Sequence, residues 1–139
     1  MKIEIFTDGG SRGNPGIAGI GAVIKSREET KKYSQFLGDH KTNNEAEYQA
    51  LIFALKKVKQ LTGKKKAKEA ILNCYADSEL MVKQLTHQYK LNNEEIKKAF
   101  LEIWNLMLDF KEVKFKHITR DKNKEADLLA NKAMDERLF

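Results

Sequence analysis

The sequence contains one cysteine, one proline and no long apolar run. Because Cys74 has no second cysteine to pair with and matches no zinc-binding spacing, we interpret it as a small buried apolar residue in a reducing compartment. The longest apolar runs, such as Leu51–Leu55, are far shorter than the roughly 20 residues that span a bilayer. The segment Met1–Phe6 is too short for a signal sequence. We therefore expect a cytoplasmic protein with no membrane partner.

The size and charge of the chain set broad limits on its class. Its 139 residues, 41% of them hydrophobic, suffice for one domain with one core. We expect a single domain over residues 1–139, present as a monomer with no obligate protein partner. The net charge of +6 favours polyanionic partners without requiring them. The densest basic cluster, Lys64–Lys68, follows a helix-ending Thr62-Gly63, so we interpret it as a solvated helix end rather than a nucleic-acid contact.

Hydrophobic periodicity predicts three consecutive strands followed by alternating helices and strands. A capping box, Thr42-Asn43-Asn44-Glu45, marks the start of the first helix. The predicted strands are residues 1–7, 17–25, 31–37, 69–76 and 112–118, with a glycine-rich turn over 8–16, and the predicted helices are 42–61, 77–87, 92–109 and a last one from about 123. The inner face of the helix 92–109 contains either Ile103 or Trp104. This order predicts an α/β fold: a mixed five-stranded sheet, three antiparallel strands then two parallel ones, with helices on both faces.

Four acids occupy positions where core residues are expected. Asp8 ends the first predicted strand and Asp77 ends the strand 69–76, so both reach one crevice if these strands are parallel neighbours. Glu47 extends the apolar stripe of the first helix, and Asp127 lies among apolar residues of the last one. Taken singly, each acid has an ordinary structural role: Asp8 as a turn former, Asp77 as an N-cap, Glu47 as a helix-terminus acid and Asp127 as a surface residue. Together, without a clear basic partner, they suggest a cation site.

Four sequence blocks resemble those of the type 1 ribonucleases H, in the same order and over essentially the whole chain. The blocks are Thr7–Gly16, Thr42–Glu47, Ala76–Ser78 and Asn123–Ala130. The resemblance implies a ribonuclease H-like fold. It also implies an endonuclease that hydrolyses the RNA strand of RNA–DNA hybrids by two-metal-ion catalysis, leaving 5′-phosphate and 3′-hydroxyl ends.

The resemblance places the metal ligands of that family on Asp8, Glu47, Asp77 and Asp127. Four carboxylates carry a charge of about −4, which two divalent ions neutralise, and oxygen ligands without a Cys or His cluster suit Mg²⁺, or Mn²⁺ as a substitute. We therefore expect two Mg²⁺ ions as cofactors and no side-chain nucleophile.

Small polar residues near these acids suit the recognition of a hybrid. A protein distinguishes RNA from DNA by the 2′-hydroxyl, which requires small side chains and backbone groups at close range. By the resemblance and by this chemistry, the predicted substrate-binding residues are Gly10, Ser11, Arg12, Asn14, Thr42, Asn43 and Asn44. The alternative is that they serve only as turn and cap residues.

Two residues compete for an auxiliary catalytic role. His117 lies ten residues before Asp127 and Arg120 seven residues before it, and family members carry one or the other kind of group there. His117 alternates with Val113, which is typical of a strand position, so we favour Arg120. The segment between His87 and Asn92 is too short for the basic protrusion of some relatives, and Glu79 replaces their Gln. Both departures predict modest, salt-sensitive substrate binding.

Two other functions remain open at this point. A nuclease of the same superfold could act on DNA, since fold does not determine function. A binding module could retain the fold without activity, although the presence of all four acids argues against that.

Overall fold

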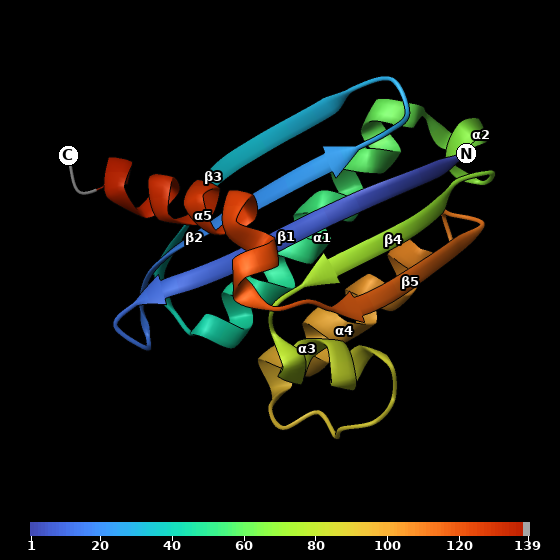
Figure 1. Ribbon diagram of the computed structural model, residues 1–139. Coiled ribbons are helices and arrows are strands. Elements are labelled where there is room, and N and C mark those ends of the chain that lie inside the picture. The colour runs from blue at the N-terminus through green and yellow to red at the C-terminus, as the bar shows by residue number, and fades with distance from the viewer. Residues whose placement is uncertain (138–139) are drawn as a thin grey trace.

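A five-stranded sheet with the order β3-β2-β1-β4-β5 forms the centre of the computed structural model, which describes residues 1–137 (Figure 1). The strands are β1 (Lys2–Arg12), β2 (Gly16–Lys25), β3 (Thr30–Lys41), β4 (Ile71–Ala76) and β5 (Glu112–His117). β1, β2 and β3 are antiparallel neighbours, whereas β4 pairs in parallel with both β1 and β5. The predicted mixed sheet is therefore confirmed.

Helices cover both faces of this sheet, as predicted. They are α1 (Asn43–Thr62), α2 (Lys64–Ala67), α3 (Glu79–Leu85), α4 (Glu94–Met107) and α5 (Lys124–Arg137), with a 3₁₀ turn, η1 (Arg120–Asn123), before α5. In Figure 1, α1 and α4 lie behind the sheet and α5 crosses in front of it. α1 packs against β1 and β2, and α5 packs against β1, β2 and β3. No helix within residues 1–137 has the length and hydropathy needed to cross a membrane.

The prediction of a turn over residues 8–16 is wrong for its first half. β1 continues to Arg12, and only residues 13–15 form the turn. Gly9 and Gly10 suggested a turn, but both pair with β2, opposite Ile20 and Gly19. The absence of a side chain at Gly9 allows α1 to approach, because a Cβ there would lie 2.2 Å from the carbonyl oxygen of Ala46. Glycine here indicates close packing rather than a change of chain direction.

Other predicted boundaries differ by a few residues. β3 extends to Lys41 instead of ending at 37, β4 begins at Ile71 instead of 69, and α3 ends at Leu85 instead of 87. On α4, Ile103 is fully buried while Trp104 is 54% exposed, which decides between the two expected inner residues. These differences follow from pairing with a neighbouring strand or from packing, which local periodicity does not record.

The start of α1 follows the predicted capping box. The Oγ1 of Thr42 accepts a hydrogen bond from the backbone N–H of Glu45 (3.1 Å), and the Oε1 of Glu45 accepts one from the backbone N–H of Thr42 (3.4 Å). Leu51 and Leu55 from this helix are buried in the core. Cys74 is also buried, as predicted, and burial raises the pKa of its thiol to about 12. The capping box therefore fixes where α1 begins, and its apolar residues determine which face meets the sheet.

Candidate active site

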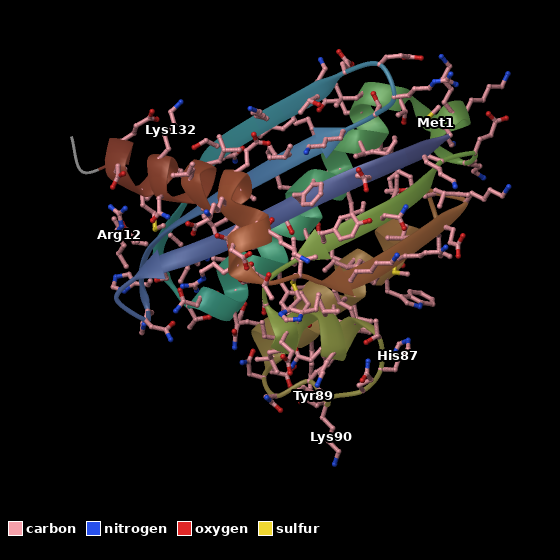
Figure 2. The ribbon with its side chains drawn as sticks, in the orientation of Figure 1. Met1, Arg12, His87, Tyr89, Lys90 and Lys132 are labelled. Atoms are coloured by element: carbon pink, nitrogen blue, oxygen red, sulfur yellow. The ribbon has the colours of Figure 1, made fainter. Side chains whose placement is uncertain are left out.

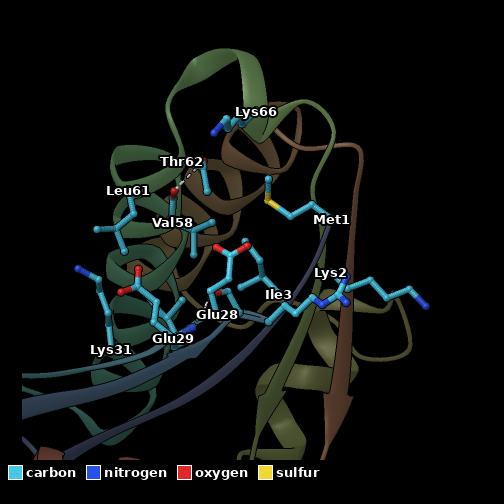
Figure 3. Close-up of a pocket in the computed structure, with 13 residues that line it drawn as sticks. Met1, Lys2, Ile3, Glu28, Glu29, Lys31, Val58, Leu61, Thr62 and Lys66 are labelled. Carbon is cyan, nitrogen blue, oxygen red and sulfur yellow. Dashed lines mark hydrogen bonds between the residues drawn. The ribbon is translucent and has the colours of Figure 1, made fainter.

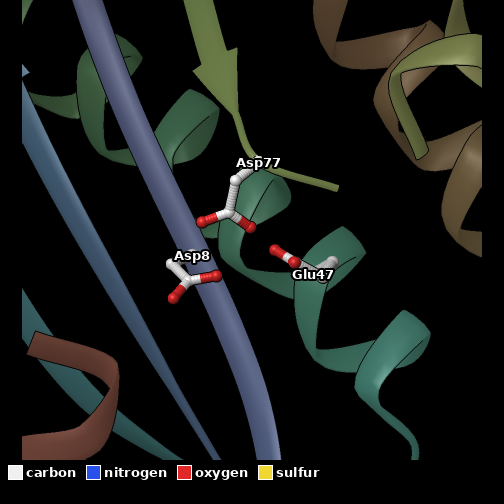
Figure 4. A group of neighbouring side chains, drawn as sticks. All are labelled: Asp8, Glu47 and Asp77. Carbon is white, nitrogen blue, oxygen red and sulfur yellow. The ribbon is translucent and has the colours of Figure 1, made fainter. Parts of the chain in front are cut away.

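Three of the four predicted acids converge where β4 ends beside the middle of β1 (Figure 4). The prediction that Asp8 ends its strand is wrong, because Asp8 still pairs with Gly21 of β2 and β1 continues to Arg12. Thr7 pairs with Ala76 across the two parallel strands, so the residues that follow them, Asp8 and Asp77, emerge side by side. Glu47 reaches the same point from the first turns of α1. One carboxylate oxygen from each acid lies within 4.8 Å of one from each of the others. This spacing allows one divalent ion to contact all three side chains.

Glu47 is held in place by the backbone of β1. Its side chain is buried, and its Oε1 accepts a hydrogen bond of 3.1 Å from the backbone N–H of Gly9. Because Gly9 has no side chain, α1 lies close enough for this bond to form. The glycine therefore positions a carboxylate as well as packing a helix.

The fourth acid, Asp127, reaches the site from α5 on the opposite face of the sheet. It lines a cleft of about 470 Å³ together with Asp8, Glu47 and Arg120. Asp127 is near enough to Asp8 to hydrogen-bond with it and to raise its pKa. It does not belong to the group of three whose oxygens lie within 4.8 Å of one another. Asp8, Glu47 and Asp127 thus border one cleft, with Asp127 on its α5 side, and Asp77 lies beside Asp8 and Glu47.

A larger cavity of about 670 Å³ lies at the other end of the sheet (Figure 3). Met1, Ile3, Val58, Leu61 and Lys66 line part of it. No predicted site residue borders this cavity, so its volume does not identify it as the site. The Lys64–Lys68 run also lies at this end, because it precedes the start of β4 whereas Asp77 follows its end.

The electrostatics of the cleft favour cations. Burial first, then the charge of Asp77 and the hydrogen bond and charge of Asp127, raise the pKa of Asp8 from 3.8 to about 8. Burial, followed by the charges of Asp8 and Asp77, raises the pKa of Glu47 well above its ordinary value. None of the ion pairs found among residues 1–137 involves any of the four acids. Clustered carboxylates without a basic partner fit hard divalent ions such as Mg²⁺ or Mn²⁺.

We expect the metal-free protein to lose stability as the pH rises from about 4 to about 8. Asp8 keeps its proton in the folded state over this range, whereas the unfolded chain, with a pKa near 3.8, has released it. The folded state therefore binds more protons, and each pKa unit corresponds to about 1.4 kcal/mol. Urea unfolding in EDTA at several pH values measures this loss. Asp8→Asn should flatten the dependence, and an unchanged slope in that variant would contradict the assignment.

The predicted substrate-binding residues form a connected rim beside the acids. The backbone N–H of Ser11 donates to the Oδ1 of Asn43 (2.8 Å), and the backbone N–H of Asn43 donates to the Oδ1 of Asn14 (3.0 Å). Gly10, Ser11, Arg12 and Asn43 line the cleft. Of the remaining predicted residues, Thr42 caps α1, while Asn14 and Asn44 are exposed and do not line the cleft.

Arg120 and His117 occupy different places. Arg120, in η1, lines the cleft with the acids. His117 is exposed at the end of β5, where it pairs with Ala76, and it does not line the cleft. Glu79 forms an ion pair with Lys83 (3.1 Å), whose hydrogen bond and charge lower the pKa of Glu79, with a smaller contribution from His117. The geometry therefore favours Arg120 as the auxiliary group.

Two asparagines contact the acids although sequence reasoning gave them no role. Asn123 is 2% exposed, and its Nδ2 donates to the carbonyl oxygen of Thr7 (2.9 Å) and to the Oδ2 of Asp77 (3.3 Å). Asn131 donates from its Nδ2 to the Oδ1 of Asp127 (3.3 Å). Only the second could have been inferred from the sequence, because residues four apart on a helix are neighbours.

The chain is similar to a known family and to several solved structures. Residues 6–133 match the family model described as reverse transcriptase-like. The crystal structure of LC11-RNase H1 in complex with an RNA/DNA hybrid is 40% identical, with a TM-score of 0.91 over 99% of both chains. Ribonuclease H1 of the archaeon Halobacterium salinarum is 32% identical, with a TM-score of 0.88 over 98% of this chain and 99% of that one.

One relative is much longer than this chain, which matches only part of it. A bifunctional protein of Mycobacterium tuberculosis is 37% identical over 97% of this chain but only 36% of its own length. The solved N-terminal RNase H domain of that protein matches at a TM-score of 0.86, with 36% identity, over 97% of this chain and 100% of that one. The chain thus spans about a third of the first curated relatives that it matches.

Proposed function

We propose that this chain, which belongs to the type 1 ribonuclease H family, is an endoribonuclease that hydrolyses the RNA strand of RNA–DNA hybrids. The single observation that carries the proposal is the convergence of Asp8, Glu47 and Asp77 with ligand atoms within 4.8 Å of one another. A polar rim that suits a sugar-phosphate backbone lies beside them. The hybrid in the complex of LC11-RNase H1 supports this choice of substrate.

The four acids Asp8, Glu47, Asp77 and Asp127 would hold two Mg²⁺ ions, or Mn²⁺ as a substitute. Bound there, the ions would supply Lewis-acid stabilisation of the charge that develops on the phosphodiester. Water adds to phosphorus and the bond to the 3′ oxygen breaks, which leaves a 5′-phosphate and a 3′-hydroxyl end. The chain itself contributes a pre-positioned set of carboxylates: the backbone of Gly9 orients Glu47, and Asn123 orients Asp77.

Arg120 and the polar rim position the substrate in this proposal. A guanidinium donates several hydrogen bonds in a fixed plane and suits a phosphate oxygen, so Arg120 takes the auxiliary role and His117 is its alternative. Ser11, Asn14 and Asn43, already linked by hydrogen bonds, present small polar groups of the kind that can contact a 2′-hydroxyl. Gly10, Arg12, Thr42 and Asn44 complete the proposed hybrid contacts.

We further propose a single domain over residues 1–139 that works as a cytoplasmic monomer without an obligate protein partner. The buried Cys74 thiol, with its raised pKa, is unreactive and agrees with a reducing compartment. Size-exclusion chromatography with light scattering tests the oligomeric state.

A strand-labelled digestion tests the proposed activity. The protein is incubated with an RNA–DNA hybrid, duplex DNA and duplex RNA, each labelled on one strand, with Mg²⁺ and with EDTA. We expect cleavage of the hybrid RNA strand only when Mg²⁺ is present, with products that carry 5′-phosphate ends. Cleavage of DNA would indicate a different nuclease of the same fold. Binding of the hybrid without cleavage would indicate a binding module, and either result would overturn the proposal.

A further inference from the structure

Three polar residues of α5 point toward the end of β1 at four-residue intervals. Asp127, Asn131 and Asp135 lie one helical turn apart and therefore share a face of the helix. The side chain of Asn131 donates to Asp127 and accepts, through its Oδ1, a hydrogen bond from the Nη2 of Arg12 (3.5 Å). The same Nη2 forms an ion pair of 2.5 Å with Asp135. A continuous polar chain thus runs from an acid of the site to an exposed carboxylate.

Arg12 lies where this series of hydrogen-bonded side chains meets the cleft. Side chains alternate along a strand, so Asp8, Gly10 and Arg12 face the same side of β1, the side on which α5 packs. The contact between Gly10 and Met134 agrees with this, because a Cβ at Gly10 would lie 3.3 Å from the Met134 Cε. Figure 2 shows Arg12 at the end of β1 beside α5. Arg12 and Asn131 line the cleft, whereas Asp135 does not.

We propose that Arg12 and Asn131 form a subsite that binds the phosphate next to the phosphate bound at the acids. In the free protein Asp135 forms an ion pair with Arg12, and a nucleic-acid phosphate replaces Asp135 when the substrate binds. The inference rests on the proposed function, since metal ions bound by the acids must hold the neighbouring phosphate. A nucleic-acid strand carries one charge at every nucleotide, so a strand held at Asp8 and Asp127 presents a further phosphate along the same groove.

The exchange of partners at Arg12 follows from the exposure of the ion pair. The side chains of Arg12 and Asp135 are 36% and 59% exposed, and exposed ion pairs stabilise a protein little. A phosphate can accept two parallel hydrogen bonds from the guanidinium, whereas the ion pair with Asp135 uses a single contact, from the Nη2 of Arg12 to the Oδ1 of Asp135. Asn131 keeps Arg12 within reach of the cleft during the exchange. Asp135 therefore lowers the affinity for substrate without touching it.

Asp135→Asn tests this competition in the full chain. We expect the variant to bind a hybrid about twofold to fivefold more tightly with Ca²⁺ in place of Mg²⁺, since both ions take oxygen ligands, as measured by fluorescence anisotropy. It should also lower KM in Mg²⁺ by a similar factor with kcat unchanged. Glu136→Gln is the matched control. It removes the same charge one residue further along, from an exposed side chain that pairs with Lys132 (3.9 Å), and should change affinity less.

Arg12→Ala completes a double-mutant cycle. Alone it should weaken hybrid binding by about tenfold or more, because a charge-assisted hydrogen bond to phosphate is lost. The double variant Arg12→Ala/Asp135→Asn should equal Arg12→Ala, since Asp135 acts only through Arg12. Thermal unfolding of each variant confirms that the fold is retained.

Three results would overturn the subsite. Equal gains from Asp135→Asn and Glu136→Gln would indicate a general charge effect. Weaker binding by Asp135→Asn would indicate that the ion pair is structural. A gain in affinity that persists in the double variant would show that Asp135 affects binding independently of Arg12. In each case the wild-type protein still cleaves the hybrid, whereas failure of the proposed function would remove wild-type cleavage itself.

Discussion

Replacing Asp8 or Asp77 by asparagine is expected to reduce cleavage of an RNA–DNA hybrid by about 10³-fold or more while the protein stays folded. Asparagine keeps the size of the side chain but removes the charge that a divalent ion requires. A loss of this size corresponds to about 4 kcal/mol of transition-state stabilisation. Both residues belong to the group whose oxygens lie within 4.8 Å of one another, so either change breaks the proposed metal site.

The same substitutions should not destabilise the metal-free protein. Because the charge of Asp77 raises the pKa of Asp8, removing one of the two carboxylates relieves their repulsion. Initial rates on a labelled hybrid and thermal unfolding in EDTA measure the two effects separately. Lys65→Ala is the control, because Lys65 lies at the far end of the sheet and should alter hybrid affinity and rate little. A cleavage rate equal to that of the wild type in Asp8→Asn or Asp77→Asn would show that the substituted acid is not part of the active site.

Gly21→Ala is expected to destabilise the protein by about 3 kcal/mol, although the substitution adds a single methyl group. A Cβ at this position would lie 2.2 Å from the carbonyl oxygen of Ala126 and 2.8 Å from the backbone nitrogen of Ala130, both in α5. Neither backbone atom can move unless the helix does. Because α5 carries Asp127, the shift should also lower the cleavage rate.

Gly10→Ala is the matched control for stability. It adds the same methyl group beneath the same helix, but the nearest atom is the terminal methyl of Met134 at 3.3 Å, which can rotate away. Urea unfolding of both variants against the wild type measures the difference in free energy of unfolding. If Gly21→Ala were as stable as Gly10→Ala, the close approach of α5 to β2 would be wrong.

Much of the fold was predictable because its signals are local. The capping box of Thr42 and Glu45 marks the start of α1, and the apolar strand that ends at Ala76 indicated a buried parallel partner for β1. Both features depend on residues within a few positions of one another, where the sequence pattern reflects helix or strand geometry directly. The convergence of Asp8 and Asp77 follows from that topology, since the parallel pairing of Thr7 with Ala76 places the next residue of each strand side by side.

Other features could not be inferred in this way. The glycines of Thr7–Gly16 are equally typical of a turn and of close packing, and only the position of α1 shows that Gly9 serves packing. Asn123 is typical of a helix start by its local sequence, whereas its contact with Asp77 joins residues 46 positions apart. No local pattern distinguishes a capping asparagine from one that holds a carboxylate.

The amino-acid sequence by itself determined the order of the elements, the mixed sheet and the four acids as candidates, because periodicity, caps and strand ends are properties of neighbouring residues. The tertiary structure alone decided which side chains meet across the cleft. It brought Arg120 rather than His117 to the acids and joined Arg12 to Asp135. Such contacts depend on how closely a helix approaches a strand far away in the chain, and that distance is set by packing over the whole core.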